Sequence, residues 1–493
     1  MSLINVTNLT FAYEGSYDNI FENVNFQIDT DWKLGFTGRN GRGKTTFLSL
    51  LLGKHEYSGN ISAHVSFEYF PFQVNNKELN TIDVISEIFP DYIHWKLMRE
   101  LSLLKVSEDV LYRPFDSLSN GEQTKVLLAT LFIKENSFLL IDEPTNHLDM
   151  TARKLVSDYL NTKSGYILVS HDRSFLDNCV DHILSINKTN IEIQKGNFSS
   201  WWENKVRQDN FELAEDEKLR RDIKRLSASS KRTGNWSHEV EKTKNGTRNS
   251  GSKLDKGYVG HKAAKMMKRS KAIEQRQQSA INEKSKLLKN IENSENLEIT
   301  QLAYHKRHLA ELDNVSVFYG EKRVCSEVSF TIEQGERIAL SGKNGSGKSS
   351  IIKLICGEEI DYTGTFTKDS QLIISYVSQD TSDLRGDLTD YARENGIDES
   401  LFKSILRKLD FSRIQFDKDI STYSGGQKKK VLIAKSLSEK AHLYIWDEPL
   451  NFIDVISRMQ IEELLLEYTP TLVFVEHDRE FCHNVATKII ELS

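Results

Sequence analysis

Two short segments of the chain repeat one pattern of glycines followed by a lysine and a hydroxyl residue. Residues 38–45 read Gly-Arg-Asn-Gly-Arg-Gly-Lys-Thr, and residues 342–349 read Gly-Lys-Asn-Gly-Ser-Gly-Lys-Ser. Glycines at this spacing let backbone N–H groups wrap a phosphate, and a helix that starts at the lysine adds its positive dipole. We expect Lys44 and Lys348 to neutralise the β- and γ-phosphates of a nucleotide, and the hydroxyls that follow them to reach Mg²⁺. The candidate nucleotide-binding residues are Gly38, Arg39, Asn40, Gly41, Arg42, Gly43, Lys44, Thr45 and Thr46 in the first segment and Gly342, Lys343, Asn344, Gly345, Ser346, Gly347, Lys348, Ser349 and Ser350 in the second.

Two apolar runs of the sequence each end in a pair of carboxylates. One run precedes Asp142 and Glu143, and the other precedes Asp447 and Glu448. Carboxylates at the end of a buried strand are costly unless they meet a metal or a substrate. We therefore expect each aspartate to hold Mg²⁺ through water. Each glutamate should polarise the attacking water as a general base.

A histidine follows an apolar strand pattern in each half of the chain, and both could contact a γ-phosphate. His171 and His477 each begin the sequence His-Asp-Arg. A single histidine is more often structural, but here glycine loop, carboxylate pair and histidine recur in the same order. The chain is thus a duplicated domain of about 190 residues, with about 100 residues between the copies. We predict domains at residues 1–198 and 301–493, joined by a linker at 199–300.

Each glycine loop lies between a strand pattern and a helix pattern. Apolar runs at 32–36 and 337–340 lead into the loops, and apolar residues at helical spacing follow at 47–51 and 351–355. Strand, glycine loop and helix form the context in which this motif binds phosphate. We expect an α/β chain with two P-loop nucleotide-binding domains in tandem.

Composition narrows the class of protein. The chain has 493 residues, of which 38% are hydrophobic and 28% charged, with a net charge of −6. No run of 18 apolar residues predicts a membrane span, and the first residues do not resemble a secretory signal. The four cysteines are scattered without a Cys-x-x-Cys pair, which favours thiols in a reducing cytoplasm over a disulfide framework or a zinc site.

The linker between the copies carries most of the positive charge. Residues 218–289 hold 21 Lys or Arg and 6 Asp or Glu, a net charge of +15, so the rest of the chain carries −21. Apolar residues recur at helical spacing at 219–226 and every seven residues at 273–287, whereas 243–260 contain turn residues without periodicity. We expect a long, coiled-coil-like helical hairpin with its tip near 243–260. A basic arm on an acidic body favours contact with a polyanion.

Both copies resemble the ATP-binding cassette (ABC) superfamily, which implies further site residues. Asp149 and Asp454 match its D-loop, and Tyr13 and Tyr319 match the aromatic residue that stacks on adenine. The resemblance implies that the copies pack head to tail and sandwich two ATP molecules, each between one copy's glycine loop and the other copy's signature. The signature residues are Ser119, Asn120, Gly121, Glu122 and Gln123 in one copy and Ser424, Gly425, Gly426 and Gln427 in the other. With the glutamines that match the Q-loop, the candidate metal-binding residues are Thr45, Gln73, Asp142, Ser349, Gln379 and Asp447.

Some positions depart from the superfamily pattern. Asn120 replaces the usual first glycine of the signature, and Tyr423 replaces its leucine. Phe452 stands where the first copy has His147. We expect two unequal sites, both active, because each keeps its lysine, aspartate, glutamate and histidine.

Two cassettes and a long basic hairpin in one chain resemble the ABC-F family. Segments that include residues 32–35, 211–215, 267–271 and 443–451 are similar to its Lsa-type antibiotic-resistance branch. This resemblance implies a cytoplasmic monomer that binds the E site of the 70S ribosome, near 23S rRNA and 50S proteins, and pushes its hairpin toward P-site tRNA. It implies protection from lincosamides, streptogramin A compounds and pleuromutilins by drug displacement. The linker residues expected to face RNA are Lys253, Leu254, Lys256, Tyr258, Lys262, Lys265, Lys268 and Arg269.

Three other functions share some of these features. A housekeeping ABC-F translation factor would have the same motifs without a role in resistance. A tandem ATPase subunit of an importer would share every cassette motif but does not need a long basic hairpin. A DNA-repair or chromosome-associated ATPase would carry a coiled coil or zinc module inside a cassette, and both copies here are uninterrupted.

Overall fold

The computed structural model describes most of both copies and part of the linker. The described residues are 2–14, 19–146, 148–187, 191–242, 261, 264–269, 271–273, 275–276, 278–279 and 297–492. His147 and the predicted tip at 243–260 lie outside them. The chain divides into two compact units, Met1–Trp201 with Ser294–Ser493, and Trp202–Asn293. Both copies fall in the first unit, so the three separate domain limits stay a prediction.

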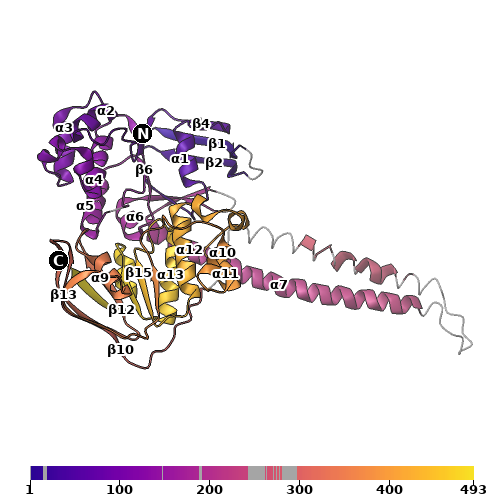
Figure 1. Ribbon diagram of the computed structural model, residues 1–493. Helices are drawn as coiled ribbons and strands as arrows, with labels where there is room; N and C mark the ends of the chain where they lie inside the picture. Colours follow the sequence, from indigo (N-terminus) through magenta and orange to yellow (C-terminus); the bar gives the residue numbers. More distant parts are fainter. Residues whose placement is uncertain are drawn as a thin grey trace, which may run out of the picture. The chain divides into compact units, whose positions relative to one another are not determined.

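The first copy contains a six-stranded sheet beside a three-stranded antiparallel sheet (Figure 1). The larger sheet runs β5-β6-β7-β3-β8-β9, and all its neighbours are parallel except β8 and β9. The smaller runs β2-β1-β4. The strands are β1 (Leu3–Phe11), β2 (Phe21–Asp29), β3 (Lys33–Thr37), β4 (Ser58–Ser62), β5 (Ser66–Phe70), β6 (Ser137–Asp142), β7 (Tyr166–Val169), β8 (His182–Ile186) and β9 (Ile191–Lys195).

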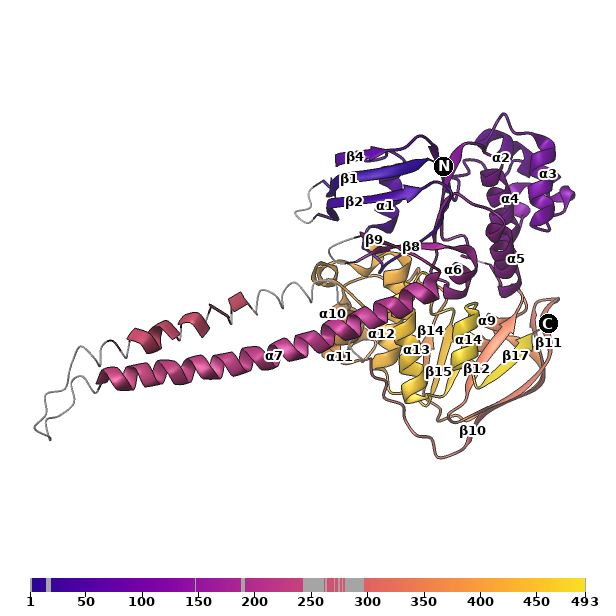
Figure 2. The same ribbon diagram turned by 180° about the vertical axis from the view of Figure 1, so that it is seen from behind.

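The second copy repeats this plan with a parallel five-stranded sheet (Figure 2). That sheet runs β14-β15-β16-β12-β17, and an antiparallel sheet runs β11-β10-β13. The strands are β10 (His308–Tyr319), β11 (Lys322–Glu333), β12 (Arg337–Gly342), β13 (Asp361–Lys368), β14 (Ile374–Val377), β15 (Leu443–Asp447), β16 (Leu472–Val475) and β17 (Lys488–Leu492).

Helices cover these sheets, and most of them start at or directly after motifs found in the sequence. The first copy has α1 (Lys44–Leu51), α2 (Thr81–Ile88), α3 (His94–Leu103), α4 (Asn120–Phe132), α5 (Met150–Asn161) and α6 (Arg173–Cys179). The second has α9 (Lys348–Cys356), α10 (Leu388–Glu394), α11 (Glu399–Lys408), α12 (Gly425–Ser438), α13 (Val455–Tyr468) and α14 (Arg479–Val485). Of these twelve helices in the described part of the cassettes, eight start at or directly after such motifs: α1, α4, α5, α6, α9, α12, α13 and α14. Phe47 of α1 packs its ring against Phe36 of β3 and Phe21 of β2. This contact fixes the helix, and hence the glycine loop, over both sheets.

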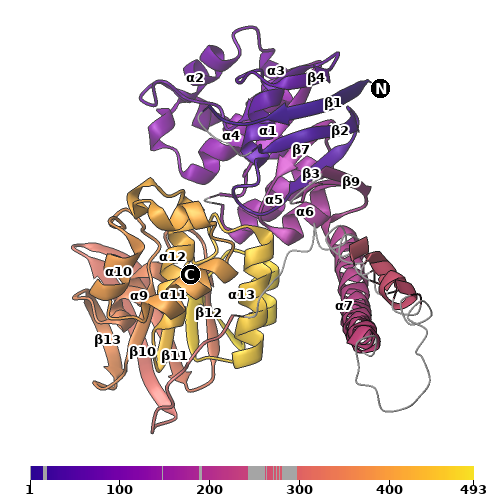
Figure 3. The same cartoon turned by 90° about the vertical axis from the view of Figure 1, so that its right-hand side faces the viewer.

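The linker begins with one long helix, α7 (Phe198–Lys242), of 45 residues. At 1.5 Å per residue it is about 68 Å long. It begins shortly after β9 ends at Lys195 (Figure 3). Described residues between 264 and 279 are also helical, and they lie beside α7 in Figures 1 and 2. No helix in the described ranges is both long enough and apolar enough to cross a membrane.

Candidate functional site

Each glycine loop has the same backbone shape and ends at the first residue of a helix. The residue before the lysine, Gly43 or Gly347, has a φ of 95° or 87°, which side-chain-bearing residues rarely adopt. A Cβ at Gly43 would lie 2.5 Å from Cγ2 of Ile20, and one at Gly347 would lie 2.8 Å from Cβ of Cys325. Both positions therefore require glycine.

The two loop lysines lie inside the loops that they follow. Lys44 Nζ donates to the carbonyl oxygens of Gly38 and Arg39 at 2.6 and 3.2 Å. Lys348 Nζ makes the equivalent bonds to Gly342 and Lys343 at 2.9 and 2.8 Å. Burial lowers the pKa of both lysines, although nearby carboxylates oppose the shift. A nucleotide phosphate in either loop would meet an ammonium group already in place.

The glutamates that follow β6 and β15 have strained backbones. Glu143 has a φ of 50° and Glu448 a φ of 48°, both left-handed. A histidine faces each of them: His171 Nε2 lies 3.3 Å from Glu143 Oε1, and His477 Nε2 lies 3.5 Å from Glu448 Oε1. The structure thus brings together, in each copy, the glutamate expected to act as general base and the histidine expected to contact the γ-phosphate.

The two glutamates differ in their electrostatic surroundings. Burial, and then the charge of Asp142, raise the pKa of Glu143 to about 8. Burial acts in the same direction on Glu448, but hydrogen bonds from His477 and Asn451 outweigh it and hold the pKa of Glu448 below its ordinary value. The second copy therefore keeps its glutamate ionised more readily.

The aspartate in each copy fits a hard cation such as Mg²⁺. Thr45 Oγ1 donates to Asp142 Oδ2 at 3.4 Å, and a hydrogen bond from Ser349 reaches Asp447. Asp447 is buried, and its Oδ1 has no hydrogen-bond partner among the described residues. Within that part of the chain, no cluster of three His, Cys, Asp or Glu side chains could hold a metal alone. Mg²⁺ commonly binds through one or two protein oxygens plus phosphate oxygens and water, which is what these residues offer.

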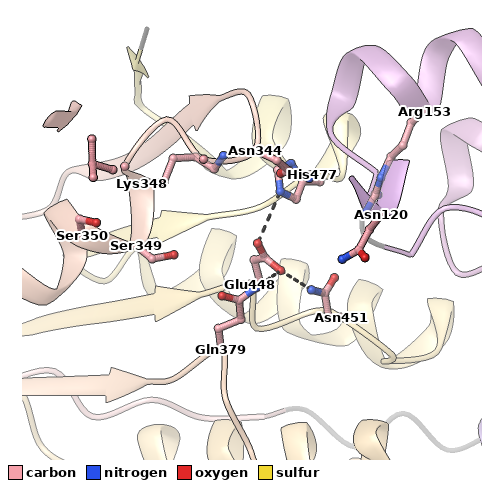
Figure 4. Close-up of a pocket in the computed structure, with 13 residues that line it drawn as sticks. Asn120, Arg153, Asn344, Lys348, Ser349, Ser350, Gln379, Glu448, Asn451 and His477 are labelled. Carbon is pink, nitrogen blue, oxygen red and sulfur yellow. Dashed lines mark hydrogen bonds and ion pairs between the residues drawn. The ribbon is translucent and has the colours of Figure 1, made fainter. Parts of the chain in front are cut away.

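A cavity of about 310 Å³ lies at the second glycine loop (Figure 4). Residues of both copies line it. In Figure 4 the side chain of Glu448 lies between those of Gln379, Asn451 and His477, and Asn120 faces them from the first copy. The lining residues are Asn120, Arg153, Val324, Asn344, Gly345, Gly347, Lys348, Ser349, Ser350, Gln379, Glu448, Asn451 and His477.

The first glycine loop makes direct contacts with the second copy. Asn40 Nδ2 donates to the carbonyl oxygen of Phe452 at 2.8 Å, and Arg42 lies 3.5 Å from Asp410. A Cβ at Gly426 would lie 2.3 Å from that same Phe452 oxygen. The second signature is thus packed against the first glycine loop, whereas the first signature borders a cavity at the second loop.

Comparison with known proteins decides the family. The profile of the ABC transporter family matches residues 21–146 and 325–451, which together exceed half of the chain. The chain belongs to this ABC family. Its two copies are ATP-binding cassettes in tandem, and the protein is an ATP hydrolase.

Relatives extend over nearly the whole chain. Ribosome protection protein VmlR of Bacillus subtilis (strain 168) is 28% identical over 501 residues, covering 100% of this chain and 87% of that protein. ABC transporter F family member 2 of Arabidopsis thaliana is 25% identical over 547 residues, covering 99% and 76%. Archaeal ribosome recycling factor aABCE1, solved in complex with ribosomal stalk protein aP1, superposes with a TM-score of 0.62 at 18% identity, covering 98% and 87%. This last similarity shows a shared fold.

The glutamines predicted as Q-loop residues lie in different surroundings in the two cassettes. Gln379 Nε2 donates to Glu448 Oε2 at 2.9 Å. Gln73 instead lines a separate cavity of about 240 Å³ with Glu68 and Lys134. The hydroxyl of Tyr69 donates to Asp142 Oδ2 at 3.0 Å in the first site.

The register of the strands explains this difference. Phe70 pairs with Ile141, and Val377 pairs with Trp446. Ile141 and Trp446 are the residues directly before the two Asp-Glu pairs. Gln379 follows Val377 by two residues, whereas Gln73 follows Phe70 by three. The first Q-loop therefore carries one extra residue, and its glutamine is shifted away from the site.

The remaining predicted residues are placed as follows. Both predicted adenine-stacking tyrosines are half exposed, and the hydroxyl of Tyr13 lies 2.9 Å from Thr46 Oγ1. Ser119 and Ser424 cap the helices that begin with the signatures, each paired in a capping box with the side chain three residues later. Lys265, Lys268 and Arg269 are exposed on helical residues. Lys253, Leu254, Lys256, Tyr258 and Lys262 lie outside the described residues.

Sequence reasoning missed several side chains at the cassette sites. Tyr69, Arg153, Lys429 and Asn451 all lie at or beside the carboxylate pairs or the cavity. For two of them a signal was present: Arg153 recurs as Arg458 at the same distance after the D-loop aspartate, and Asn451 matches Asn146. Lys429 lies two residues after the second signature and Tyr69 four residues before Gln73, but no spacing shows that either side chain reaches a carboxylate pair, and only the fold brings them to the site.

Proposed function

We propose that this ATPase is an ABC-F protein that acts on the ribosome. The observation that carries the proposal is the basic arm, residues 218–289. The arm has a net charge of +15, whereas the rest of the chain has a net charge of −21. Ribosomal RNA and tRNA are dense polyanions, and lysine and arginine side chains bind their phosphates with release of counterions. The arm continues a single helix, α7, of 45 residues and about 68 Å, and this length supports contact with an RNA-rich site.

The proposed binding place is the E site, with the arm directed toward P-site tRNA and the peptidyl-transferase centre. From there the arm would protect the ribosome from lincosamides, streptogramin A compounds and pleuromutilins by displacing the drug. The name of the relative VmlR, a ribosome protection protein that matches the full length of this chain, supports this proposal. So does the exposure of Lys265, Lys268 and Arg269 on the returning segment of the arm. The protein would be cytoplasmic and ribosome-associated.

The proposed chemistry is ATP hydrolysis at two composite sites, each built from one cassette's glycine loop and the other cassette's signature. Lys44 and Lys348 would hold the phosphates, and Glu143 and Glu448 would take a proton from the attacking water. The histidine beside each glutamate would orient it. Asp142 with Thr45, and Asp447 with Ser349, would hold Mg²⁺, which would neutralise charge on the phosphates.

One double variant tests the sites and the partner together. Glu143→Gln/Glu448→Gln should bind ATP but hydrolyse it about 10²–10⁴-fold more slowly, because it lacks both general bases. It should also stay bound to ribosomes and pellet with them in the presence of ATP. The matched control is Glu135→Gln/Glu358→Gln, which changes two exposed glutamates away from both sites. Wild-type turnover in the first variant would contradict the assigned bases, and absence from the ribosome pellet would contradict the partner.

Drug protection is tested separately by shortening the arm at 249–256. We expect ATPase activity and ribosome pelleting to remain, because these residues belong to neither cassette, while minimum inhibitory concentrations of lincosamides and pleuromutilins fall to the level of cells without the protein. If the wild type itself raises no inhibitory concentration but still pellets with ribosomes, the protein is a translation factor without a resistance role.

A further inference from the structure

A buried lysine of the second cassette lies next to its catalytic strand ends. Lys429 is on α12, five residues after Ser424, the signature serine that caps this helix. Its side chain is only 2% exposed. Lysines are seldom buried this completely unless they are paired, because removing an ammonium group from water is costly. We therefore expect the ammonium group of Lys429 to have partners inside the protein.

The ammonium group of Lys429 joins two neighbouring strands at their carboxyl ends. Nζ donates to the carbonyl oxygen of Ser378 at 2.8 Å and to that of Asp447 at 3.4 Å. Ser378 follows β14, and Asp447 ends β15. One side chain thus fixes the start of the Q-loop against the strand that carries the Asp-Glu pair.

Ser378, whose carbonyl oxygen binds Lys429, is next in sequence to Gln379, whose side chain contacts Glu448. Gln379, which follows Ser378, donates to Glu448 Oε2 at 2.9 Å, and Asn451 donates to the same oxygen (Figure 4). The loop is also closed on itself, since Ser378 Oγ donates to the carbonyl oxygen of Asp380 at 3.0 Å. Movement of Ser378 would therefore move Gln379 and loosen its bond to the glutamate.

In the first cassette, a threonine stands at the position equivalent to Lys429. The residue five positions after its signature serine Ser119 is Thr124, whose hydroxyl donates to the carbonyl oxygen of Asn120 at 2.9 Å, within its own helix. Its Q-loop glutamine, Gln73, lies in another cavity. Absence of the lysine and displacement of the glutamine thus occur together in the same copy.

We propose that Lys429 is a positioning residue of the second ATP site, which holds the Q-loop so that Gln379 fixes the carboxylate of Glu448 toward the attacking water. The inference rests on the proposed roles of Glu143 and Glu448 as general bases. It assigns the two sites different degrees of preorganisation: the second has its glutamate fixed before nucleotide binds, and the first does not.

The test isolates each site with a glutamine variant of the opposite glutamate. In the Glu143→Gln background, Lys429→Met should lower kcat for ATP hydrolysis about tenfold or more and leave KM within about twofold, because a misplaced catalytic group affects the transition state rather than nucleotide binding. In the Glu448→Gln background, the same substitution should change kcat less than about twofold. Lys429→Gln, which keeps an N–H donor, should recover part of the loss. The matched control is Lys435→Met, which changes a half-buried lysine on the same helix.

Amide hydrogen exchange provides a readout that does not depend on turnover. Lys429→Met should speed exchange at Asp380 and Ser382, whose amides are hydrogen-bonded within the Q-loop, and leave residues 70–75 of the first cassette unchanged. Equal loss of activity in both backgrounds, or exchange that rises throughout α12 and its neighbours, would show that the lysine merely stabilises the fold and would overturn the proposal. Unchanged kcat with unchanged exchange would overturn it as well. If neither glutamine background lowers turnover, the proposed bases are wrong, and the exchange result alone decides whether Lys429 holds the loop.

Discussion

The ion pair of Arg173 joins the two cassettes through buried charges. Arg173, on α6, pairs with Glu462 on α13, and its Nε lies 3.5 Å from Oε2 of Glu480 on α14. Arg173 is 9% exposed and Glu462 is 7% exposed. Asn484 donates to the other oxygen of Glu462 at 2.7 Å. Substituting the arginine would therefore leave a buried carboxylate with one neutral donor and without its cation.

The size of the effect follows from burial. Removing one partner of a buried ion pair costs about 3–5 kcal/mol, because the remaining charge stays buried. A domain of the size of one cassette loses roughly 2–4 °C of Tm per kcal/mol. We expect Arg173→Met to lower the Tm of the cassettes by roughly 6–20 °C. The double variant Arg173→Met/Glu462→Leu should recover most of this loss, since it buries no uncompensated charge.

Thermal unfolding followed by calorimetry or circular dichroism measures this directly. The chain supplies a matched control in Arg479, the equivalent of Arg173 in the second cassette. Arg479 is exposed at the edge of a cavity of about 510 Å³, and Ser157 occupies the position equivalent to Glu462. Arg479→Met should shift Tm by no more than about 2 °C, as expected for a surface substitution. Equal shifts for the two arginines, or a double variant as unstable as the single one, would refute the reasoning.

Three further predictions concern the basic arm, the loss of stability at low pH and the first glycine loop. Replacing Lys265, Lys268 and Arg269 by glutamine should weaken ribosome pelleting and flatten its salt dependence. The slope of log K against log salt should fall by about 0.7–0.9 for each phosphate that is no longer neutralised. An unchanged slope would mean that these side chains contact only water. The pKa of Glu100 lies below its ordinary value of 4.5, because hydrogen bonds from a lysine and a tyrosine outweigh its burial. Its contribution to stability is therefore complete above pH 4.5 and is lost as pH falls through the lowered pKa. Glu100→Gln should flatten this acid dependence in urea unfolding, and an unaltered profile would show that Glu100 does not contribute to it. Gly43→Ala should abolish binding of a fluorescent ATP analogue at the first site, since the new Cβ would lie 2.5 Å from a neighbouring side chain, and normal binding would show that the loop can relax.

The glycine loops and carboxylate pairs could be predicted from sequence because their signals are local. A helix that starts at Lys44 or Lys348 is set by the glycine before it, and an apolar strand that ends in Asp-Glu is visible in six consecutive residues. The duplication supports the assignment, since each landmark recurs in order. The α/β tandem fold followed from the same alternation of strands and helices.

The side chains that surround the carboxylates of the two ATP sites could not be predicted in this way, because their positions depend on strand register and on contacts between residues distant in sequence. Gln73 and Gln379 look alike in sequence, but one additional residue after β5 separates them in the fold. Tyr69 approaches Asp142 only because β5 and β6 pair in parallel. Similarly, the position of Lys429 relative to Asp447 depends on how α12 packs against the sheet, which no pattern of spacing encodes.

The divergence of the two cassettes also follows a physical rule about buried charge. The second cassette has Lys429 on its signature helix and Glu476 before its histidine, and the first has Thr124 and Ser170 at these positions. Glu476 is the carboxylate that acts most strongly on the lysine, and it holds the backbone N–H of Leu450 at 2.7 Å. Asp447 and Glu448 also act on the lysine, while the charge of Arg458 and the N–H of Leu450 act on Glu476, so each of the two buried charges has partners of its own. At these two positions the second cassette therefore buries two charges where the first has two neutral hydroxyl side chains, and this difference distinguishes the second ATP site from the first.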